Sequence, residues 1–167
     1  MKAFFLIFNL FLIILVSTIG IIIILTGRKD IYGYRALIVL SGSMEPTIKT
    51  GSLIFIKKEK NYKKNDVVSY GSVVRKNAIV THRIIDIIKK QNIKYFILKG
   101  DANKSRDLYP VPATAVLGKF IFAIPFLGYF ISFAKTPLGL IILIIIPGTI
   151  IIWEEIKNLK SIFLLKR

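Results

Sequence analysis

Hydrophobic residues are concentrated in two long stretches, one toward each end of the chain. The first stretch runs from Ala3 to Leu25, and its few interruptions are Asn9, Ser17, Thr18 and Gly20. A helix needs about 20 predominantly apolar residues to cross the hydrocarbon core of a bilayer. The pattern therefore predicts an N-terminal transmembrane anchor over residues 1–27.

A cleavable signal peptide is the alternative interpretation of this first stretch. The apolar run is longer than the roughly 7–15 residues of a signal h-region, and no A-x-A cleavage site follows it. Arg28 and Lys29 come directly after the run instead. We interpret residues 1–27 as an anchor that is not removed.

The second apolar stretch begins near Lys119 and is divided by Lys135, Thr136 and Pro137. The apolar part of residues 120–137, Phe120 to Ala134, is short for a membrane span and contains Pro125 and Gly128. Their aromatic side chains are typical of the headgroup level of a membrane, which predicts a final strand leading into an interfacial segment.

Residues 138–155 are the stronger candidate for a second span, a C-terminal transmembrane helix with a kink expected at Pro147. Residues 156–167 form a basic tail, which favours a cytoplasmic C-terminus. With two spans the N-terminus is cytoplasmic as well. The predicted protein is thus a multi-pass protein of the cell membrane whose middle region is extracytoplasmic, since long loops translocate largely regardless of charge.

The middle region, residues 28–119, reads as β-rich. Short segments rich in Ile, Val, Phe and Tyr alternate with Gly, Asn, Ser and Lys clusters, as strands and turns do. The predicted strands are Arg35–Leu40, Ser52–Lys57, Asp66–Tyr70, Ala78–Ile88 and Lys94–Lys99. The isoleucines of Thr81–Lys90 also fit a helix in part, but β-branched residues dominate and favour a strand. The predicted fold is a mainly β, compact domain between two transmembrane helices.

The amino-acid composition restricts the nucleophiles, metal sites and binding partners that the chain can have. The mean hydropathy of +0.63 is too high for an ordinary soluble protein, yet 20% of residues are charged. Cysteine is absent and there is one histidine, which excludes a thiolate nucleophile and a multi-His or Cys metal site, so we expect no metal and no cofactor. The net charge of +16 fits a surface near anionic lipid headgroups. Nucleic-acid binding is disfavoured because the basic residues accompany no recognised binding motif.

Ser43 lies in the run Ser-Gly-Ser-Met-Glu-Pro, directly after an apolar strand. Gly42 permits a close backbone approach, and Pro46 confines Glu45 to extended geometry. Such a turn presents a hydroxyl beside free amides, which suits acyl transfer. Ser-Gly-Ser turns are nevertheless common and mostly structural.

A serine nucleophile needs a base, and His82, in Val-Thr-His-Arg, is the natural candidate at neutral pH. Taken alone, His82 would be interpreted as a half-exposed histidine on a β-sheet. The later segment Gly100–Asp107 offers two carboxylates, Asp101 and Asp107, that could orient the imidazole. Loop acids also commonly make turns, and the spacing does not decide between the two.

These three segments together resemble type I signal peptidases, in particular the branch shared by the endoplasmic reticulum, archaea and some Gram-positive bacteria. The Ser-Gly-Ser-Met-Glu-Pro, Thr-His-Arg and Gly-Asp-Ala-Asn…Asp boxes occur in the family's order and approximate spacing. The likeness continues through Leu-Gly-Lys, Pro-Phe-Leu-Gly-Tyr and the C-terminal span. Relatives often have Asn at the position of Ala102, a departure that affects little.

The resemblance implies that Ser43 is the nucleophile and His82 the general base, where the other branch uses lysine. It favours Asp107 over Asp101 as the orienting acid, with Asp101 helping to shape the site. It also implies an oxyanion hole formed by the Ser43 amide with the Ser41 hydroxyl.

The expected substrates are secretory preproteins with signal peptides, cleaved at the surface of the lipid bilayer; the sequence leaves open whether accessory subunits are needed. An inactive subunit of a processing complex would require none of the Ser, His and Asp residues. A self-cleaving repressor-like protease would have a lysine base and a DNA-binding domain. Both alternatives fit this sequence less well.

Overall fold

The computed structural model describes residues 32–72 and 78–165, together with residues 8, 10, 13, 14, 17, 18, 20 and 21. The predicted anchor at residues 1–27 lies outside the described residues, apart from those eight positions. The chain divides into two compact units, a β unit that ends at Tyr129 and a helical unit that includes the residues from Phe130 onward.

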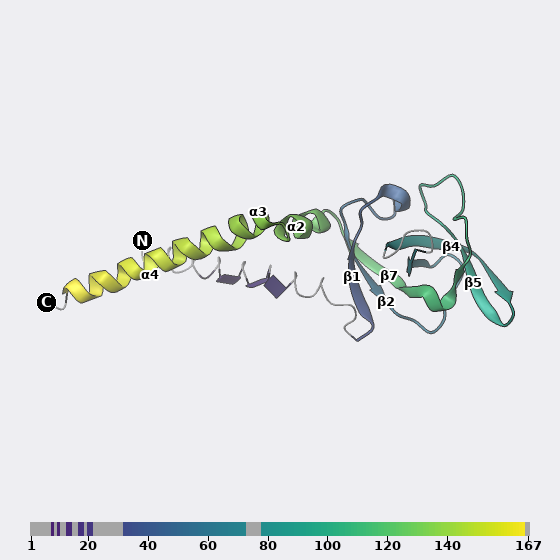
Figure 1. The fold of residues 1–167 in the computed structure, drawn as a ribbon, viewed down its shortest axis with the longest axis horizontal. Coiled ribbons are helices and arrows are strands. Elements are labelled where there is room, and N and C mark those ends of the chain that lie inside the picture. Colours follow the sequence, from purple (N-terminus) through teal and green to yellow (C-terminus); the bar gives the residue numbers. More distant parts are fainter. Residues whose placement is uncertain are drawn as a thin grey trace. The chain divides into compact units, whose positions relative to one another are not determined.

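The β unit is built on a seven-stranded antiparallel sheet with strand order β1-β2-β7-β3-β4-β5-β6 (Figure 1). The strands are β1 (Tyr34–Ile38), β2 (Leu53–Lys57), β3 (Val67–Gly71), β4 (Ile79–Lys90), β5 (Ile93–Lys99), β6 (Val111–Pro112) and β7 (Val116–Ile124). Two short 3₁₀ turns, η1 (Gly42–Met44) and η2 (Ala113–Ala115), lie in the connections. The predicted mainly β domain is confirmed.

The strand predictions agree closely with the sheet. All five predicted segments overlap a strand to within two residues at each end, and Thr81–Lys90 lies within β4 rather than in a helix. β7 runs through residue 119 and pairs with β2 as far as Ile124, so residues 120–124 belong to the sheet. The second apolar stretch of the sequence is long because the residues of β7 are followed, after two residues, by a helix that begins at Leu127.

Buried side chains form two clusters within the β unit. The first contains Val68, Tyr70, Ile84, Phe96, Leu98, Val111 and Val116. The second contains Met44, Ile48, Ile54, Ile56 and Val67. Since burial of each large apolar side chain contributes roughly 1.5–3 kcal/mol, these clusters fix the strands and also the loop between β1 and β2.

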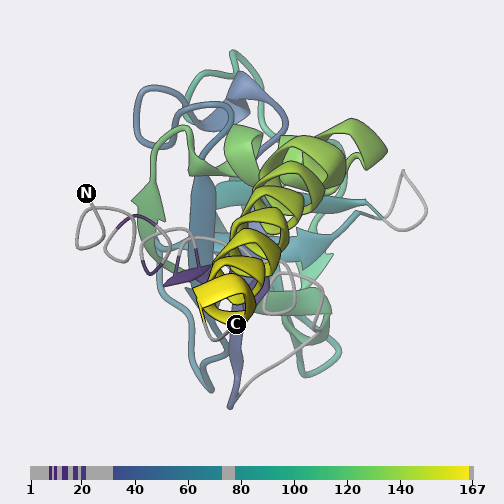
Figure 2. The same ribbon diagram turned by 90° about the vertical axis from the view of Figure 1, so that its left-hand side faces the viewer.

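The C-terminal part of the chain is helical. α2 spans Leu127–Ala134, and α3 (Pro137–Leu140), the π-helical turn η3 (Ile141–Ile145) and α4 (Ile146–Leu165) follow. Viewed nearly end-on, the coil from α3 to α4 is continuous (Figure 2). The π-helical turn lies just before Pro147, whose missing N–H cannot bond to the preceding turn, and the kink expected there stays a prediction.

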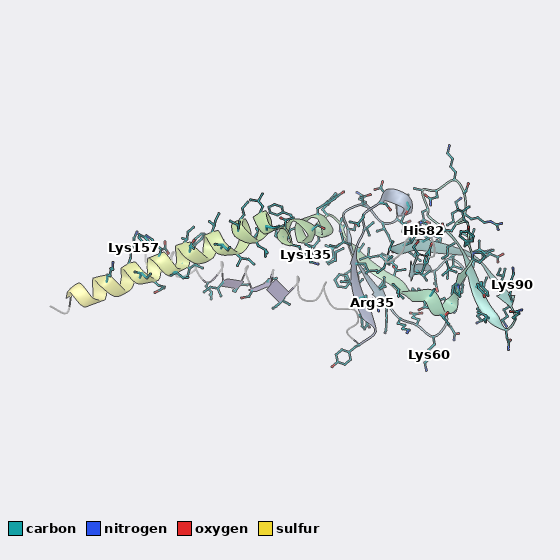
Figure 3. All side chains as sticks on the ribbon, viewed as in Figure 1. Arg35, Lys60, His82, Lys90, Lys135 and Lys157 are labelled. Atoms are coloured by element: carbon teal, nitrogen blue, oxygen red, sulfur yellow. The ribbon has the colours of Figure 1, made fainter. Side chains whose placement is uncertain are left out.

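One helix among the described residues, Pro137–Lys157, is long and apolar enough to cross a membrane. Its most apolar window has a mean hydropathy of 2.1, and its 21 residues span about 32 Å at 1.5 Å per residue. Lys157 lies 5.5 Å over the ring of Trp153, an arrangement typical of an interface. Both Lys135 and Lys157 are labelled in Figure 3, before and at the end of this stretch.

Candidate active site

The loop between β1 and β2 carries Ser43 on the turn η1. Its base is closed by two backbone bonds, from Val39 N to Ser52 O at 2.9 Å and from Gly51 N to Val39 O at 2.9 Å. Met44, next to Ser43, is 2% exposed and belongs to the second core cluster. Burial of that neighbour holds the Ser43 backbone in place, while Ser43 itself is half-buried.

Glu45 has the extended backbone expected before proline, with φ −69° and ψ 146°. Its Oε1 accepts bonds from Thr50 N at 3.1 Å and from Thr50 Oγ1 at 2.8 Å. The backbone bond from Thr50 is the main reason that the pKa of Glu45 is lowered from its ordinary value. The Glu45 carboxylate therefore holds the loop closed through its two bonds to Thr50.

His82 lies on β4 opposite Val68 of β3 and is 7% exposed. Its position among the strands of the β unit is labelled in Figure 3. Nε2 lies 3.2 Å from Ser43 Oγ, and Nδ1 lies 2.8 Å from Asp107 Oδ2. The ring thus joins a hydroxyl on one side to a carboxylate on the other. A neutral imidazole with its proton on Nδ1 would offer a free lone pair to the serine.

Asp107 follows β5 in the chain and is fixed to that strand by a 2.8 Å bond from its backbone N to Leu98 O. The same Oδ2 that faces His82 also accepts a 2.6 Å bond from the Tyr70 hydroxyl. Burial, followed by this bond, raises the pKa of Tyr70 above its ordinary value, so the phenol stays protonated and acts as a donor. Sequence reasoning missed Tyr70. The available signal was its place two residues from Val68, which puts it on the same face as His82 once β3 and β4 are paired.

Asp101 has different partners. Its carboxylate accepts bonds from Arg83 Nε at 2.8 Å and Nη2 at 2.7 Å, and from Thr47 Oγ1 at 2.6 Å. The hydrogen bond from Arg83 is the largest cause of the lowered pKa of Asp101. Arg83 also donates from Nη1 to Asn65 O at 3.0 Å. Asp101 therefore ties the Ser43 loop to β4, while Asp107 is the acid in contact with the imidazole.

Gly100 begins the segment that carries both acids and lies directly against the other site residues. A Cβ at this position would lie 2.5 Å from Ser43 O and 3.0 Å from His82 Nε2, so any side chain would displace one of them. Ala102 N donates to the same Ser43 carbonyl at 3.0 Å. The segment thus packs on the backbone of the serine turn as well as on the imidazole.

Ser41 precedes η1 with an extended backbone, and its side chain makes no capping bond to the turn. The Ser43 amide lies in the first turn of η1, where backbone N–H groups have no acceptor within the helix. Ser41 thus lies just before the turn that carries Ser43, and the role of both residues as oxyanion donors stays a prediction.

A cavity of about 630 Å³ opens beside the imidazole. It is lined by Tyr70 and Val80 of adjacent strands, by His82, and by the segment from Ala102 to Leu108. The site therefore has open space next to the imidazole ring of His82.

Comparison with known proteins shows to which family the chain belongs. No family model matches it. Signal peptidase I W of Bacillus subtilis (strain 168) is 43% identical over 88 residues, which are 51% of this chain and 45% of that protein. A signal peptidase complex catalytic subunit of Debaryomyces hansenii is 33% identical over 121 residues, 62% of this chain and 72% of that protein. The chain belongs to the type I signal peptidase family.

A human signal peptidase matches a segment about as long as the Bacillus subtilis match. A signal peptidase complex catalytic subunit of Homo sapiens is 34% identical over 90 residues, 52% of this chain and 44% of that protein. The matches to the Bacillus subtilis and human signal peptidases thus span somewhat less than half of each of those proteins. Bacterial and eukaryotic signal peptidases both appear among the relatives, which agrees with the branch that the three sequence boxes indicate.

The ion pair of Arg83 with Asp101 makes the stability of the protein fall at acid pH. The folded-state pKa of Asp101 is lowered, so its contribution is fully present above the unfolded value of about 3.9 and is lost as pH falls through the folded value. We expect Asp101→Asn to lower the free energy of unfolding by about 2 kcal/mol at pH 7. The difference from wild type should shrink below about pH 4.

The measurement is urea unfolding of the full chain in detergent at several pH values. Asp86→Asn serves as a control, because Asp86 is an exposed carboxylate of β4 that bonds only locally, to Ile87 N at 2.9 Å. Equal losses for both variants, or a loss that does not change with pH, would contradict this role for the ion pair.

Proposed function

We propose that this chain is a membrane-bound serine endopeptidase that removes signal peptides from secreted preproteins. The observation that carries the proposal is the single imidazole of His82, which contacts Ser43 Oγ at 3.2 Å and Asp107 Oδ2 at 2.8 Å. A nucleophile, a base and an orienting acid in that order are the arrangement needed for acyl transfer by serine. The family relationship supports signal-peptide removal as the reaction and preproteins as the substrate class.

In the proposed reaction, His82 Nε2 takes the Ser43 proton as Oγ attacks the scissile carbonyl carbon. Asp107 stabilises the resulting imidazolium through Nδ1. The imidazolium then gives its proton to the leaving amine as the C–N bond breaks, and an ester to Ser43 remains. Water attacks the ester, His82 accepts the water proton, and the proton returns to Ser43 Oγ as the new carboxylate leaves.

The developing oxyanion would be bound by the Ser43 amide, with the Ser41 hydroxyl as second donor. Preorganised donors of this kind are often the largest electrostatic contribution to acyl transfer. The chain supports this role because Ser41 immediately precedes η1, the turn that carries the Ser43 hydroxyl and the Ser43 amide.

The proposal also includes the arrangement of the chain in the membrane. The apolar helix Pro137–Lys157 supports attachment to the lipid bilayer. We further propose that residues 1–27 form a second span, that both termini are cytoplasmic and that the β unit is extracytoplasmic. A β unit held at the outer membrane surface would meet precursors as they leave the membrane, which restricts the substrates to membrane-inserted preproteins.

The proposal is tested by cleavage of a signal-bearing precursor with purified full-length protein in lipid vesicles. Wild type is expected to release the mature protein, and Ser43→Ala is expected to leave the precursor intact. Thr114→Ala is a matched control, because it removes an exposed hydroxyl from η2, outside the site. Processing by Ser43→Ala at the wild-type rate, or an inactive wild type, would refute the endopeptidase function.

A further inference from the structure

Tyr70 is the one buried phenol in contact with the proposed catalytic groups in the described part of the chain. Its side chain is 5% exposed and belongs to the first core cluster. Its hydroxyl reaches out of that cluster to Asp107 Oδ2, at 2.6 Å. A buried hydroxyl requires a hydrogen-bond partner, and here the partner is the carboxylate that faces His82.

The strand pairing explains why Tyr70 reaches this carboxylate. In the register of β3 and β4, Val68 lies opposite His82 and Tyr70 lies opposite Val80, so Tyr70 and His82 share a face of the sheet as diagonal neighbours. Their rings are 6.4 Å apart and meet edge to face at 60°. The pairing of β3 with β7 is irregular between Ser69 and Tyr70. Such irregularities commonly re-aim a side chain.

One oxygen of Asp107 receives both bonds. Oδ2 accepts from Tyr70 at 2.6 Å and contacts His82 Nδ1 at 2.8 Å. Because the aspartate side chain turns freely about its terminal bond unless it is held, a rigid donor from the core fixes which oxygen faces the imidazole. The phenol also takes up part of the negative charge of that oxygen.

We propose that Tyr70 is a positioning residue of the signal peptidase site, which holds the Asp107 carboxylate toward His82 and tunes its charge. This inference rests on the proposed function, since it assigns Tyr70 a role in the same proton transfer. Tyr70 does not touch the reacting atoms and acts through Asp107.

The test compares wild type with Tyr70→Phe, which keeps the aromatic ring in the core and removes only the hydroxyl. We expect kcat for precursor cleavage to fall about tenfold, the loss of one hydrogen bond to a charged group, with KM nearly unchanged. Tyr62→Phe is the matched control. Tyr62 packs edge-on against Phe96 in the same cluster and bonds to Glu59 N, away from the imidazole.

The pH dependence of kcat/KM distinguishes a positioning role of Tyr70 from a role in core packing alone. Ionisable and polar groups facing His82 are Ser43 from η1, Tyr70 from β3, and Asp107 and the Arg83-bound Asp101 from the following loop. Without the phenol, Asp107 carries more negative charge toward the imidazole, so His82 gains its proton more easily. The acid limb of kcat/KM should therefore move to higher pH in Tyr70→Phe and stay in place in Tyr62→Phe.

A double-mutant cycle completes the test. In an Asp107→Ala background, where the acceptor is gone, Tyr70→Phe should change kcat less than about twofold. All rates are measured at a temperature at which the unfolding curves show every variant folded. Equal losses in both backgrounds, or an unmoved acid limb with active wild type, would overturn the positioning role. An inactive wild type would instead overturn the proposed function.

Discussion

Replacing His82 with alanine is expected to lower the rate of precursor cleavage by at least about 10⁴-fold. His82 is the one side chain in contact with Ser43 Oγ among the hydrogen bonds of the described residues. Without it the hydroxyl proton has no acceptor, and the leaving amine has no donor. The loss should appear in kcat, because the remaining binding surface for the precursor is unchanged.

Two further variants at this position separate chemistry from packing. Glutamine retains a polar side chain in the space between Ser43 and Asp107 but cannot take up a proton, so His82→Gln should be as inactive as His82→Ala. Unfolding of the purified full chains should show that both remain folded. Substantial cleavage by either variant would contradict the assignment of His82 as the base.

Lysine at this position is an informative comparison, because the other branch of the family uses a lysine base. Here Asp107 faces the ring, and a carboxylate next to an ammonium group favours its charged form. A protonated lysine cannot accept the Ser43 proton, so we expect His82→Lys to remain inactive at neutral pH. Restored cleavage would show that this site does not distinguish the two kinds of base.

Much of the β unit could be predicted from local sequence. β-branched residues in Thr81–Lys90 correctly favoured the strand β4 over a helix, because their side chains fit a pleated surface better than a helix. β6 escaped prediction because it has only two residues, one of them Pro112. The end of β7 was uncertain because a continuous apolar run does not distinguish a buried strand from a membrane-facing segment.

The residues of the candidate site could be selected from the sequence, but their contacts could not. Sequence motifs indicated Ser43, His82 and two acids, but Asp101 and Asp107 are only six positions apart in one segment. What separates them is tertiary: Arg83, the neighbour of His82 on the opposite face of β4, binds Asp101. Tyr70 was invisible to the motif search because its role depends on the register between β3 and β4.

Asp107→Asn is expected to reduce kcat roughly 10³-fold, while Asp101→Asn should reduce it by about tenfold at most. The difference follows from their partners. Asp107 Oδ2 contacts His82 Nδ1 at 2.8 Å, whereas both oxygens of Asp101 are bound by Arg83. Loss of charge at Asp107 removes the stabilisation of the imidazolium, and loss of charge at Asp101 mainly weakens the link between the Ser43 loop and β4.

The asparagine variant is a sharp probe because Tyr70 remains in place. The phenol donates to the oxygen that faces His82, so it should keep the amide oxygen of the asparagine in that position and preserve the proton on Nδ1. The loss of kcat by about 10³-fold would then result from the missing charge of Asp107 and not from an imidazole that carries its proton on Nε2. Combining Asp107→Asn with Tyr70→Phe should cost more than Asp107→Asn alone, because the amide can then turn its NH₂ group toward the ring. A larger loss of kcat in Asp101→Asn than in Asp107→Asn, measured in the same precursor assay, would contradict Asp107 as the orienting acid.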